Sequence, residues 1–308
     1  MVGSGAVGCY FGGMLARAGA AVTLIGRPQH VEACNRNGLR MDTTRFQATV
    51  PVAASADIAD ARGAQLVLFC VKSIDSETAA LALAPHLAPG AIVLDLQNGV
   101  DNVPRICRHV PNPVVAAVVY VACEMIGAGC VKHHGRGDLV IGAMDTGGGH
   151  VVPSRAQLDE LAALLVRGEI PTLISENIEG ELWLKFLINC AYNAISALGR
   201  SRYARMTAMP ESRTVMEQAV REVLALARAA GVRMPEGDLV AQAIRLADAM
   251  PRQLSSMAQD LARGKRTEID DLNGFVARRG SELGVPTPVN STLHALVKLL
   301  EYGGPDAA

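Results

Sequence analysis

An alternation of short apolar runs with helical patterns dominates the first half of the chain. Residues 21–25, 66–71 and 91–96 are nearly continuous apolar runs, which are typical of strands buried on both faces of a parallel sheet. Helical patterns over residues 7–17 and 76–87 lie between these runs. Strands that alternate with helices in this way predict an α/β sheet built from βαβ units.

The end of this half is expected to complete the sheet. A further strand is predicted over residues 114–121, and Gly135 and Gly137 suggest a hairpin centred on them within residues 131–141. A helix over residues 157–166 and one short strand over residues 170–174 are expected to follow.

After residue 176 the sequence shows helical periodicity and no convincing strand. Helices are expected over residues 179–198, 211–230, 239–250 and 268–283. A chain of 308 residues also exceeds the size that one hydrophobic core usually serves. We therefore expect a Rossmann-type α/β domain over residues 1–174 and an all-helical domain over residues 175–308.

Composition excludes several classes of protein. Hydrophobic residues make up 50% of the chain and the formal net charge is -1, so neither disorder nor a global attraction to nucleic acid or anionic membranes is expected. Residues 1–16 lack the basic start of a signal peptide, and residues 109–123 are too short to span a bilayer. The seven cysteines are odd in number and lack zinc-like spacing. A soluble, cytoplasmic protein without a metal is expected.

The N-terminus carries Gly3, Gly5 and Gly8 in the pattern G-x-G-x-x-G, with Ser4, Ala6 and Val7 between them. Glycines at this spacing allow a tight turn, a close approach of a diphosphate to the backbone, and packing of the next helix on the sheet. The helical pattern and apolar run that follow favour a dinucleotide-binding loop over a structural turn. Only two residues precede Gly3, so the central strand is expected to be short, as in a chain with a truncated or misassigned start.

Two cations follow the ends of predicted strands. Arg27 stands about 20 residues after the glycine motif, where an NAD site usually has an acid for the ribose hydroxyls. An arginine there can pair with a 2′-phosphate, which favours NADP(H). Lys72 follows the run over residues 66–71 and is a second candidate for the adenosine phosphate. The alternatives are a solvated loop arginine and a surface lysine.

A polar row interrupts the apolar helix predicted over residues 179–198. Lys185, Asn189 and Asn193 are spaced four residues apart and share one face, with Ser196 on the same stripe. Asparagine is a poor helix former, so its repeated use favours a binding site over a solvent-facing stripe. Lysine is scarce here, with only five in the chain, which makes the placement of Lys72 and Lys185 more informative.

Three weaker candidates lie elsewhere. Glu268 follows Thr267, which is expected to cap a new helix, so Glu268 is explained equally well by the helix dipole or by catalysis. Asn98 precedes Gly99 just beyond the run over residues 91–96, where α/β sheets bind ligands, but Asn-Gly is also an ordinary turn. The adjacent histidines 133 and 134 lack acidic partners at ligand spacing and are interpreted as hairpin residues.

Together these motifs resemble the ketopantoate reductase (2-dehydropantoate 2-reductase) family, whose second domain is of the 6-phosphogluconate dehydrogenase type. The resemblance covers nearly the whole chain and implies NADPH-dependent reduction of a 2-oxo acid, foremost 2-dehydropantoate to pantoate in pantothenate and coenzyme A biosynthesis. It rests on the glycine motif, Val71-Lys72, Gln97-Asn98-Gly99, Lys185-x-x-x-Asn189-x-x-x-Asn193, and Ser255-Ser256-Met-x-Gln-Asp260 leading to Thr267-Glu268-Ile-Asp270.

The resemblance also implies roles for individual residues. Lys185 is similar to the catalytic lysine of the family, and Glu268 is expected to join it by accepting a hydrogen bond from a substrate hydroxyl. Asn98, Asn189, Asn193 and Ser256 resemble the residues that hold the substrate. The cofactor set comprises Gly3, Ser4, Gly5, Ala6, Val7, Gly8, Arg27, Lys72 and Asn98.

Asp75 departs from the family pattern, because a glutamine often stands there and an aspartate would not hold a phosphate. A related reductase for a different 2-oxo acid, or an inactive NADP(H)-binding sensor, are the alternative readings of the same motifs. The helical domain could support a homodimer, although nothing in the sequence demands one.

Overall fold

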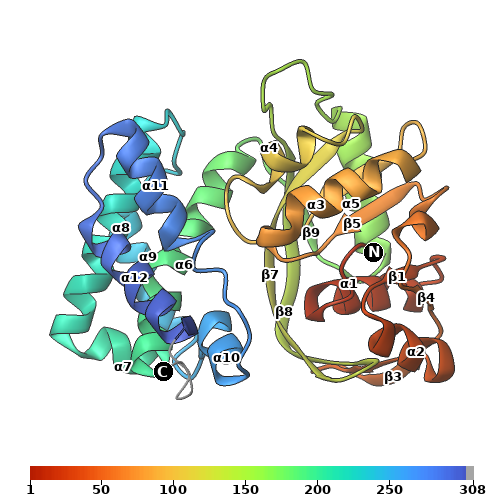
Figure 1. The fold of residues 1–308 in the computed structure, drawn as a ribbon, viewed down its shortest axis with the longest axis horizontal. Helices are drawn as coiled ribbons and strands as arrows, with labels where there is room; N and C mark the ends of the chain where they lie inside the picture. The colour runs from red at the N-terminus through yellow and green to blue at the C-terminus, as the bar shows by residue number, and fades with distance from the viewer. Residues whose placement is uncertain (303–308) are drawn as a thin grey trace. The chain divides into compact units, whose positions relative to one another are not determined.

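The computed structural model describes residues 1–302. Contacts between residues separate two compact units, Met1–Ile178 and a second unit from Glu179 onward (Figure 1). The first unit is a mixed α/β domain and the second is built from helices, as the sequence pattern predicts. The predicted boundary at residues 174 and 175 lies just before this division. Among the described residues, no helix is long and apolar enough to cross a membrane.

The apolar runs of the first half form parallel strands. They are β1 (Thr23–Ile25), β5 (Leu66–Phe69), β6 (Ile92–Asp95) and the start of β7 (Val114–Gly127). β5 pairs with β6, and β6 with β7, all in parallel. Because parallel strands end at the same edge, the segments after β5 and β6 lie side by side, which makes that edge the place to look for a ligand site.

Val2 takes the central position that a first Rossmann strand would occupy. It forms parallel bridges to Ile25 of β1 on one side and to Phe69 of β5 on the other. Its N–H donates to the Leu68 carbonyl at 2.9 Å, and its carbonyl accepts from Cys70 N–H at 2.7 Å. The strand is as short as expected, but hydrogen bonds on both sides join β1 to the rest of the sheet.

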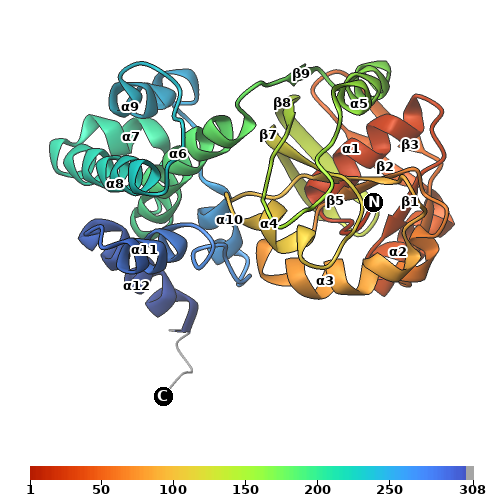
Figure 2. The same ribbon diagram turned by 90° about the horizontal axis from the view of Figure 1, so that it is seen from above.

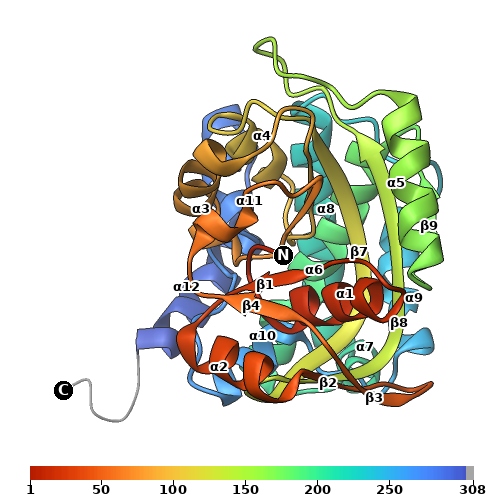
Figure 3. The same cartoon turned by 90° about the vertical axis from the view of Figure 1, so that its right-hand side faces the viewer.

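A hairpin is present, but its turn was predicted at the wrong position, around Gly135 and Gly137. β7 and β8 (Cys130–Ala143) form one long antiparallel hairpin, seen side by side in Figure 3, and the chain reverses at Gly129, whose φ is 68°. Gly137 instead lies at a register shift, since Tyr120 pairs with Asp138 and Val121 with Arg136. The pairing continues through residue 127, so the turn comes earlier than the glycine pattern suggests.

Short strands extend the sheet beyond the predicted ones. β9 (Thr172–Ile174) was expected and pairs with β8, whereas β2 (Leu39–Asp42), β3 (Gln47–Val50) and β4 (Ala53–Ser55) were not predicted. The order of the larger sheet is β3-β2-β8-β7-β6-β5, and β4 pairs with β1 beyond the bridge at Val2.

Helices cover both faces of this sheet. α1 (Ala6–Arg17) and α5 (Arg155–Arg167) lie on one side of the strands, and α3 (Ser76–Leu83) lies on the other (Figure 2). Phe11, Met14 and Leu165 are buried in the core between α1, α5 and the sheet. The remaining elements are α2 (Pro28–Asn37), α4 (Asn102–Cys107) and three short 3-10 turns, η1 (Ile58–Ala61), η2 (Ser73–Asp75) and η3 (Ala84–His86).

The second unit is built on α6 (Ile178–Gly199), a 22-residue helix whose Phe186, Leu187 and Tyr192 are almost fully buried. Phe186 meets Phe275 edge to face, and the Tyr192 hydroxyl donates to the Ala243 carbonyl at 3.0 Å. The other helices are α7 (Tyr203–Ala208), α8 (Pro210–Ala229), α9 (Leu239–Ala249), α10 (Ser256–Ala262), α11 (Asn273–Leu283) and α12 (Pro288–Tyr302).

The predicted start of α11 at Glu268 is wrong, because the helix begins at Asn273. Thr267 does accept a hydrogen bond from Ile269 N–H, but its hydroxyl also donates to Glu301 at 2.7 Å. Glu268 therefore lies in a turn before the helix, where its carbonyl accepts from Leu272 N–H at 3.0 Å.

Candidate active site

The glycine loop lies against the end of β5. Gly3 has a φ of +97°, and a Cβ there would lie 2.6 Å from the Cys70 carbonyl carbon and the Val71 nitrogen. A Cβ at Gly8 would lie 2.2 Å from the Gly3 carbonyl oxygen. Any side chain at these two positions would push the loop off the sheet, so both glycines are required by the fold itself.

A second close approach joins the loop to the end of β1. A Cβ at Gly26 would lie 1.6 Å from Ser4 Oγ and 2.9 Å from Ser4 Cβ, so any side chain there would displace the serine side chain from its present position. The next residue, Arg27, is exposed at the start of α2. Within residues 1–302, its guanidinium has no ion pair or hydrogen bond. Arg27 thus follows a residue that contacts the glycine loop, and its guanidinium is not paired with an acidic side chain within residues 1–302.

The middle glycine of the motif, Gly5, faces open space. A Cβ at Gly5 would meet nothing within 4 Å, although the backbone φ of -75° suits any residue. Gly5 precedes α1, whose N-terminus has no side-chain cap and no acidic residue in its first turn. The amides of Ala6 and Val7 begin this helix, and such a terminus favours a phosphate. The loop therefore fits the diphosphate of a dinucleotide.

Lys72 lies at the edge where β5 ends. It precedes the 3-10 turn η2, its backbone is extended, and the side chain is half-buried. Asp75, at the end of the same turn, is exposed and makes no side-chain cap for α3. Lys72 and the glycine loop are thus neighbours through Cys70 and Val71.

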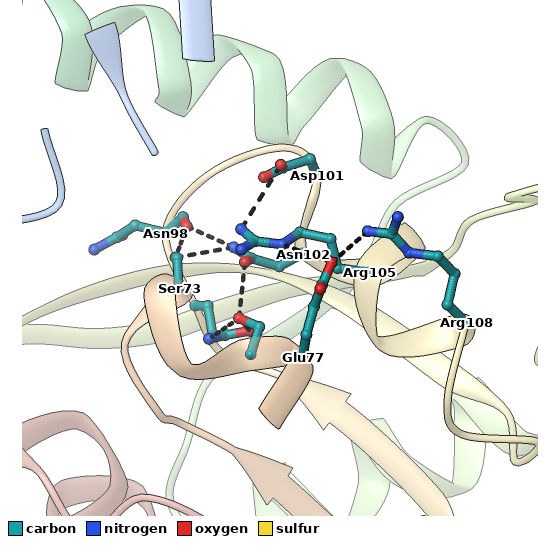
Figure 4. A network of polar contacts seen from close by, with 9 residues as sticks. Ser73, Glu77, Asn98, Asp101, Asn102, Arg105 and Arg108 are labelled. Atoms are coloured by element: carbon teal, nitrogen blue, oxygen red, sulfur yellow. Dashed lines mark hydrogen bonds and ion pairs between the residues drawn. The ribbon is translucent and has the colours of Figure 1, made fainter. Parts of the chain in front are cut away.

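A chain of buried hydrogen bonds joins the segments after β5 and β6 (Figure 4). Gln97 Nε2 donates to the Val71 carbonyl and to Ser76 Oγ, both at 2.8 Å. Asn102 Nδ2 donates to the Asn98 carbonyl at 2.7 Å, and Ser73 Oγ donates to the same carbonyl at 2.9 Å. Sequence reasoning found Asn98 but missed its supports, Ser73, Ser76 and Asn102.

Asp95 ends β6 just before this network. Burial raises the pKa of its carboxyl to about 7; the Gln97 N–H, which donates to it at 3.1 Å, opposes this shift, and the charge of Asp101 adds to it. A carboxyl with this pKa changes its charge within the neutral range.

In the second unit, the predicted polar row lies on one helix, α6. Lys185 and Asn189 are half-buried, while Asn193 is only 4% exposed. Among residues 1–302, the side-chain amides of Asn189 and Asn193 form no hydrogen bond. Other buried asparagines each donate to protein carbonyl or side-chain oxygens, namely Asn102, Asn112, Asn273 and Asn290. Buried amides are ordinarily satisfied, so the amide of Asn193 is suited to a ligand, and the half-buried Asn189 one turn before it extends the same row.

The end of the row is tied to α10. Ser196 Oγ donates to the Ser201 carbonyl at 2.8 Å and accepts from Ser255 N–H at 3.2 Å. Ser255 Oγ donates to the Asn193 carbonyl at 3.2 Å and caps α10 through Ala258 N–H. Ser255 is therefore structural, and it places the exposed Ser256 next to the Asn193 end of the row.

Glu268 is held between two anchored neighbours. Glu301 of α12 accepts from both the N–H and the hydroxyl of Thr267 at 2.7 Å. Asp270 accepts from His294 and Lys298 of α12, each at 2.8 Å. These contacts fix the turn that carries Glu268 against α12, and sequence reasoning gave none of the three partners a role.

Other features of the chain do not form a site around these residues. His133 stacks on Tyr10 and His134 pairs with Glu124, so both are hairpin residues. Over the described part of the chain, no group of histidine, cysteine and acidic side chains could hold a metal. A cavity of about 560 Å³ between the end of α8 and the start of α9 is lined by none of the candidate residues.

Comparison with known proteins agrees with this arrangement. The model of the ketopantoate reductase PanE/ApbA family matches residues 1–146, and that of its C-terminal part matches residues 177–301. This chain belongs to the ketopantoate reductase family. Membership makes it an oxidoreductase, and the motif residues described above fall within the two matched segments.

Curated relatives of this ketopantoate reductase family member extend over its full length. The 2-dehydropantoate 2-reductase of Halobacterium salinarum is 34% identical over 308 residues, covering 98% of each chain. The protein of the same name from Pyrobaculum aerophilum is also 34% identical, covering 98% of this chain and 97% of its own.

Solved structures show the same fold. The PanE/ApbA family ketopantoate reductase of Ralstonia eutropha JMP134 is 52% identical, with a TM-score of 0.89 and 97% of each chain covered. A D-mandelate dehydrogenase solved with NADH and anilino(oxo)acetate has a TM-score of 0.87 at 23% identity, with 97% of each chain covered. That identity establishes a shared fold only.

Proposed function

We propose that this family member reduces 2-dehydropantoate (ketopantoate) to pantoate with NADPH, in pantothenate and coenzyme A biosynthesis. The observation that carries the proposal is the row on α6, where the half-buried Asn189 and the buried Asn193 follow Lys185 at four-residue intervals. Their side-chain amides form no hydrogen bond within residues 1–302. The names of the full-length relatives support the choice of substrate.

The first unit would hold the cofactor. The glycine loop from Gly3 to Gly8 and the start of α1 suit the diphosphate, and Arg27 suits the 2′-phosphate of NADPH. Lys72 adds a second cation at the same edge of the sheet. Asn98 follows the end of β6, where it would bind the nicotinamide ribose or the substrate. Bound NADPH supplies the hydride that reduces the keto carbon.

The second unit would hold and protonate the substrate. Lys185 Nζ donates a proton to the alkoxide that forms when the carbonyl carbon accepts hydride, which completes the 2-hydroxy acid. An arginine could not take this role, because its guanidinium does not give up a proton in proteins. The amides of Asn189 and Asn193 can bind the carboxylate without adding a charge, and Ser256 offers a further hydroxyl.

Glu268 accounts for the choice among 2-oxo acids. Its carboxylate can accept a hydrogen bond from a hydroxyl on the substrate, and ketopantoate carries one at C4. The anchoring of Thr267 and Asp270 on α12 holds the Glu268 backbone in place for this role. A 2-oxo acid without that hydroxyl would lose the interaction.

The deciding experiment follows NADPH oxidation at 340 nm with ketopantoate and with a panel of 2-oxo acids lacking the 4-hydroxyl. We expect ketopantoate to give the highest kcat/KM, and NADPH to be preferred over NADH. A higher kcat/KM for another 2-oxo acid would make the chain a related reductase. NADPH binding without turnover of any panel member would make it a sensor, and either result would overturn the proposal.

The cytoplasm is the compartment we propose, since all seven cysteines are free thiols, which a reducing environment preserves. A homodimer formed through the helical unit stays a prediction, to be tested by light scattering. Nucleic acid and membranes are not expected as partners, given the net charge of -1.

A further inference from the structure

We propose that Asn102 is a positioning residue that holds the Asn98 segment in register with the Lys72 segment. The inference rests on the proposed function in one respect, namely that Asn98 binds the cofactor or the substrate. Asn102 is the first residue of α4, only 2% exposed, and its side chain connects the ends of two neighbouring strands (Figure 4).

The hydrogen bonds around Asn102 form a directed chain. Gln97 Nε2 uses its two protons on the Val71 carbonyl and Ser76 Oγ. Ser76 Oγ donates onward to Asn102 Oδ1 at 3.2 Å. Gln97 Oε1 lies 3.1 Å from the same Ser76 hydroxyl, so the amide oxygens of Gln97 and Asn102 share this donor. The chain begins at the carbonyl that precedes Lys72.

The chain ends at Asn98. Asn102 Nδ2 uses its two protons on the Asn98 carbonyl at 2.7 Å and on Ser73 Oγ at 3.2 Å. Ser73 Oγ donates its own proton to the Asn98 carbonyl at 2.9 Å. One amide therefore fixes both the backbone of Asn98 and the turn that follows Lys72, and a buried network of this kind is rigid only when every member is satisfied.

The charge and direction of the amide matter. Asn102→Asp keeps the size of the side chain but replaces Nδ2 with an oxygen that faces two other oxygen atoms, Asn98 O and Ser73 Oγ. Two donors are lost, and acceptors are left opposed in a buried place. We expect the segments of residues 72–76 and 97–101 to loosen together.

Asn112 provides a matched control in the same unit. It is 8% exposed, and its Nδ2 donates to the carbonyls of Ala88 and Ala91 at 2.9 and 3.0 Å. Ala91 precedes β6, so Asn112 lies at the opposite edge of the sheet from Asn98. Asn112→Asp likewise removes two hydrogen bonds donated by a buried amide, but it does so away from the candidate site.

The experiment compares amide hydrogen exchange in the full-length wild type and both variants. We expect Asn102→Asp to speed exchange at least tenfold in residues 72–76 and 97–101, while Asn112→Asp leaves these segments within twofold of wild type. In turnover assays at a temperature below both unfolding transitions, we expect Asn102→Asp to lower kcat/KM for ketopantoate at least tenfold, and Asn112→Asp to retain it within twofold.

Unchanged exchange in both segments of Asn102→Asp would overturn the inference, whatever the wild type catalyses. Equal losses of kcat/KM in the two variants would also overturn it, because the effect would then be one of general stability. If Asn102→Asp exchanges faster than wild type but the wild type itself oxidises no NADPH, the positioning role is supported and the proposed function is contradicted. Failure of the inference and failure of the proposed function are therefore distinguishable.

Discussion

The Lys298 ammonium lies 2.8 Å from Asp270 Oδ2, and this ion pair ties the turn that carries Glu268 to α12. Burial raises the pKa of Asp270, but hydrogen bonds from His294, Lys298 and Arg266 outweigh it and lower the pKa to about 2. The pKa of Lys298 is raised, first by its hydrogen bond to Asp270, which agrees in sign. Asp270 therefore has a structural role within Thr267-Glu268-Ile-Asp270, one of the motifs that resemble the ketopantoate reductase family.

The first prediction concerns the stability given by Asp270. Because its folded pKa is below the unfolded value, its stabilisation is present above about pH 4 and is lost as the pH falls toward 2. Asp270→Asn should lower the free energy of unfolding by about 1–2 kcal/mol at pH 7 and by roughly half as much at pH 3. Urea unfolding at both pH values measures this, with Asp248→Asn at an exposed position of α9 as the control. An equal loss at both pH values would contradict it.

Substitutions at Gly3 and Gly5 should distinguish an effect on stability from an effect on cofactor binding. A methyl group at Gly3 would meet the Cys70 backbone, so Gly3→Ala should cost about 2 kcal/mol or more in stability. Gly5→Ala adds a methyl group to open space, so the melting temperature should stay within about 2 °C of wild type. NADPH titration followed by its fluorescence should nevertheless show a Kd at least tenfold higher for Gly5→Ala. Wild-type affinity in that variant would remove the glycine loop from the cofactor site.

Arg27 should decide between the two nicotinamide cofactors. Arg27→Ala should raise the Kd of NADPH about tenfold, since one charge-assisted contact to the 2′-phosphate is lost, and should leave the Kd of NADH within twofold. Arg62 is also exposed, but it precedes β5 at the opposite edge of the sheet, so Arg62→Ala serves as the control. Parallel changes for NADPH and NADH in Arg27→Ala would count against a 2′-phosphate contact.

Asp95 should make the first unit less stable as the pH rises. Its folded pKa of about 7 lies above the unfolded value of 3.8, so stability is highest below pH 4 and is lost as the pH rises through 7. Asp95→Asn removes this ionisation and keeps an acceptor for Gln97 N–H, so its stability relative to wild type should increase between pH 5 and pH 8. Unfolding midpoints across that range test it, with the exposed Asp60→Asn as reference. A constant difference would show that Asp95 stays charged throughout.

Strands buried on both faces were predicted from their apolar runs. β1, β5 and β6 coincide with apolar runs because both of their faces are covered, whereas β2 alternates Leu39 and Met41 with Arg40 and Asp42 over only four residues. Four residues give too little periodicity to distinguish a strand from a loop. The hairpin turn was misplaced because glycine serves register shifts as well as turns.

The residues of the candidate site were chosen one by one from the sequence, whereas the residues that support them were not. Asn98 and the row on α6 follow from local spacing, since strand ends and helix faces are local properties. The side-chain partners of Asn102 come from two segments and lie up to 29 residues away in sequence, and Thr267 binds Glu301 across 34 residues. Such pairs are set by tertiary packing, which no short-range pattern contains.

The central claim is that Lys185 supplies the proton for reduction of a 2-oxo acid. The most direct test is single-turnover oxidation of bound NADPH by ketopantoate in wild type and Lys185→Ala, with the Kd of NADPH measured for both. We predict a rate that is about 10²–10⁴-fold lower in the variant, with an unchanged Kd. Oxidation at the wild-type rate in Lys185→Ala would contradict the account.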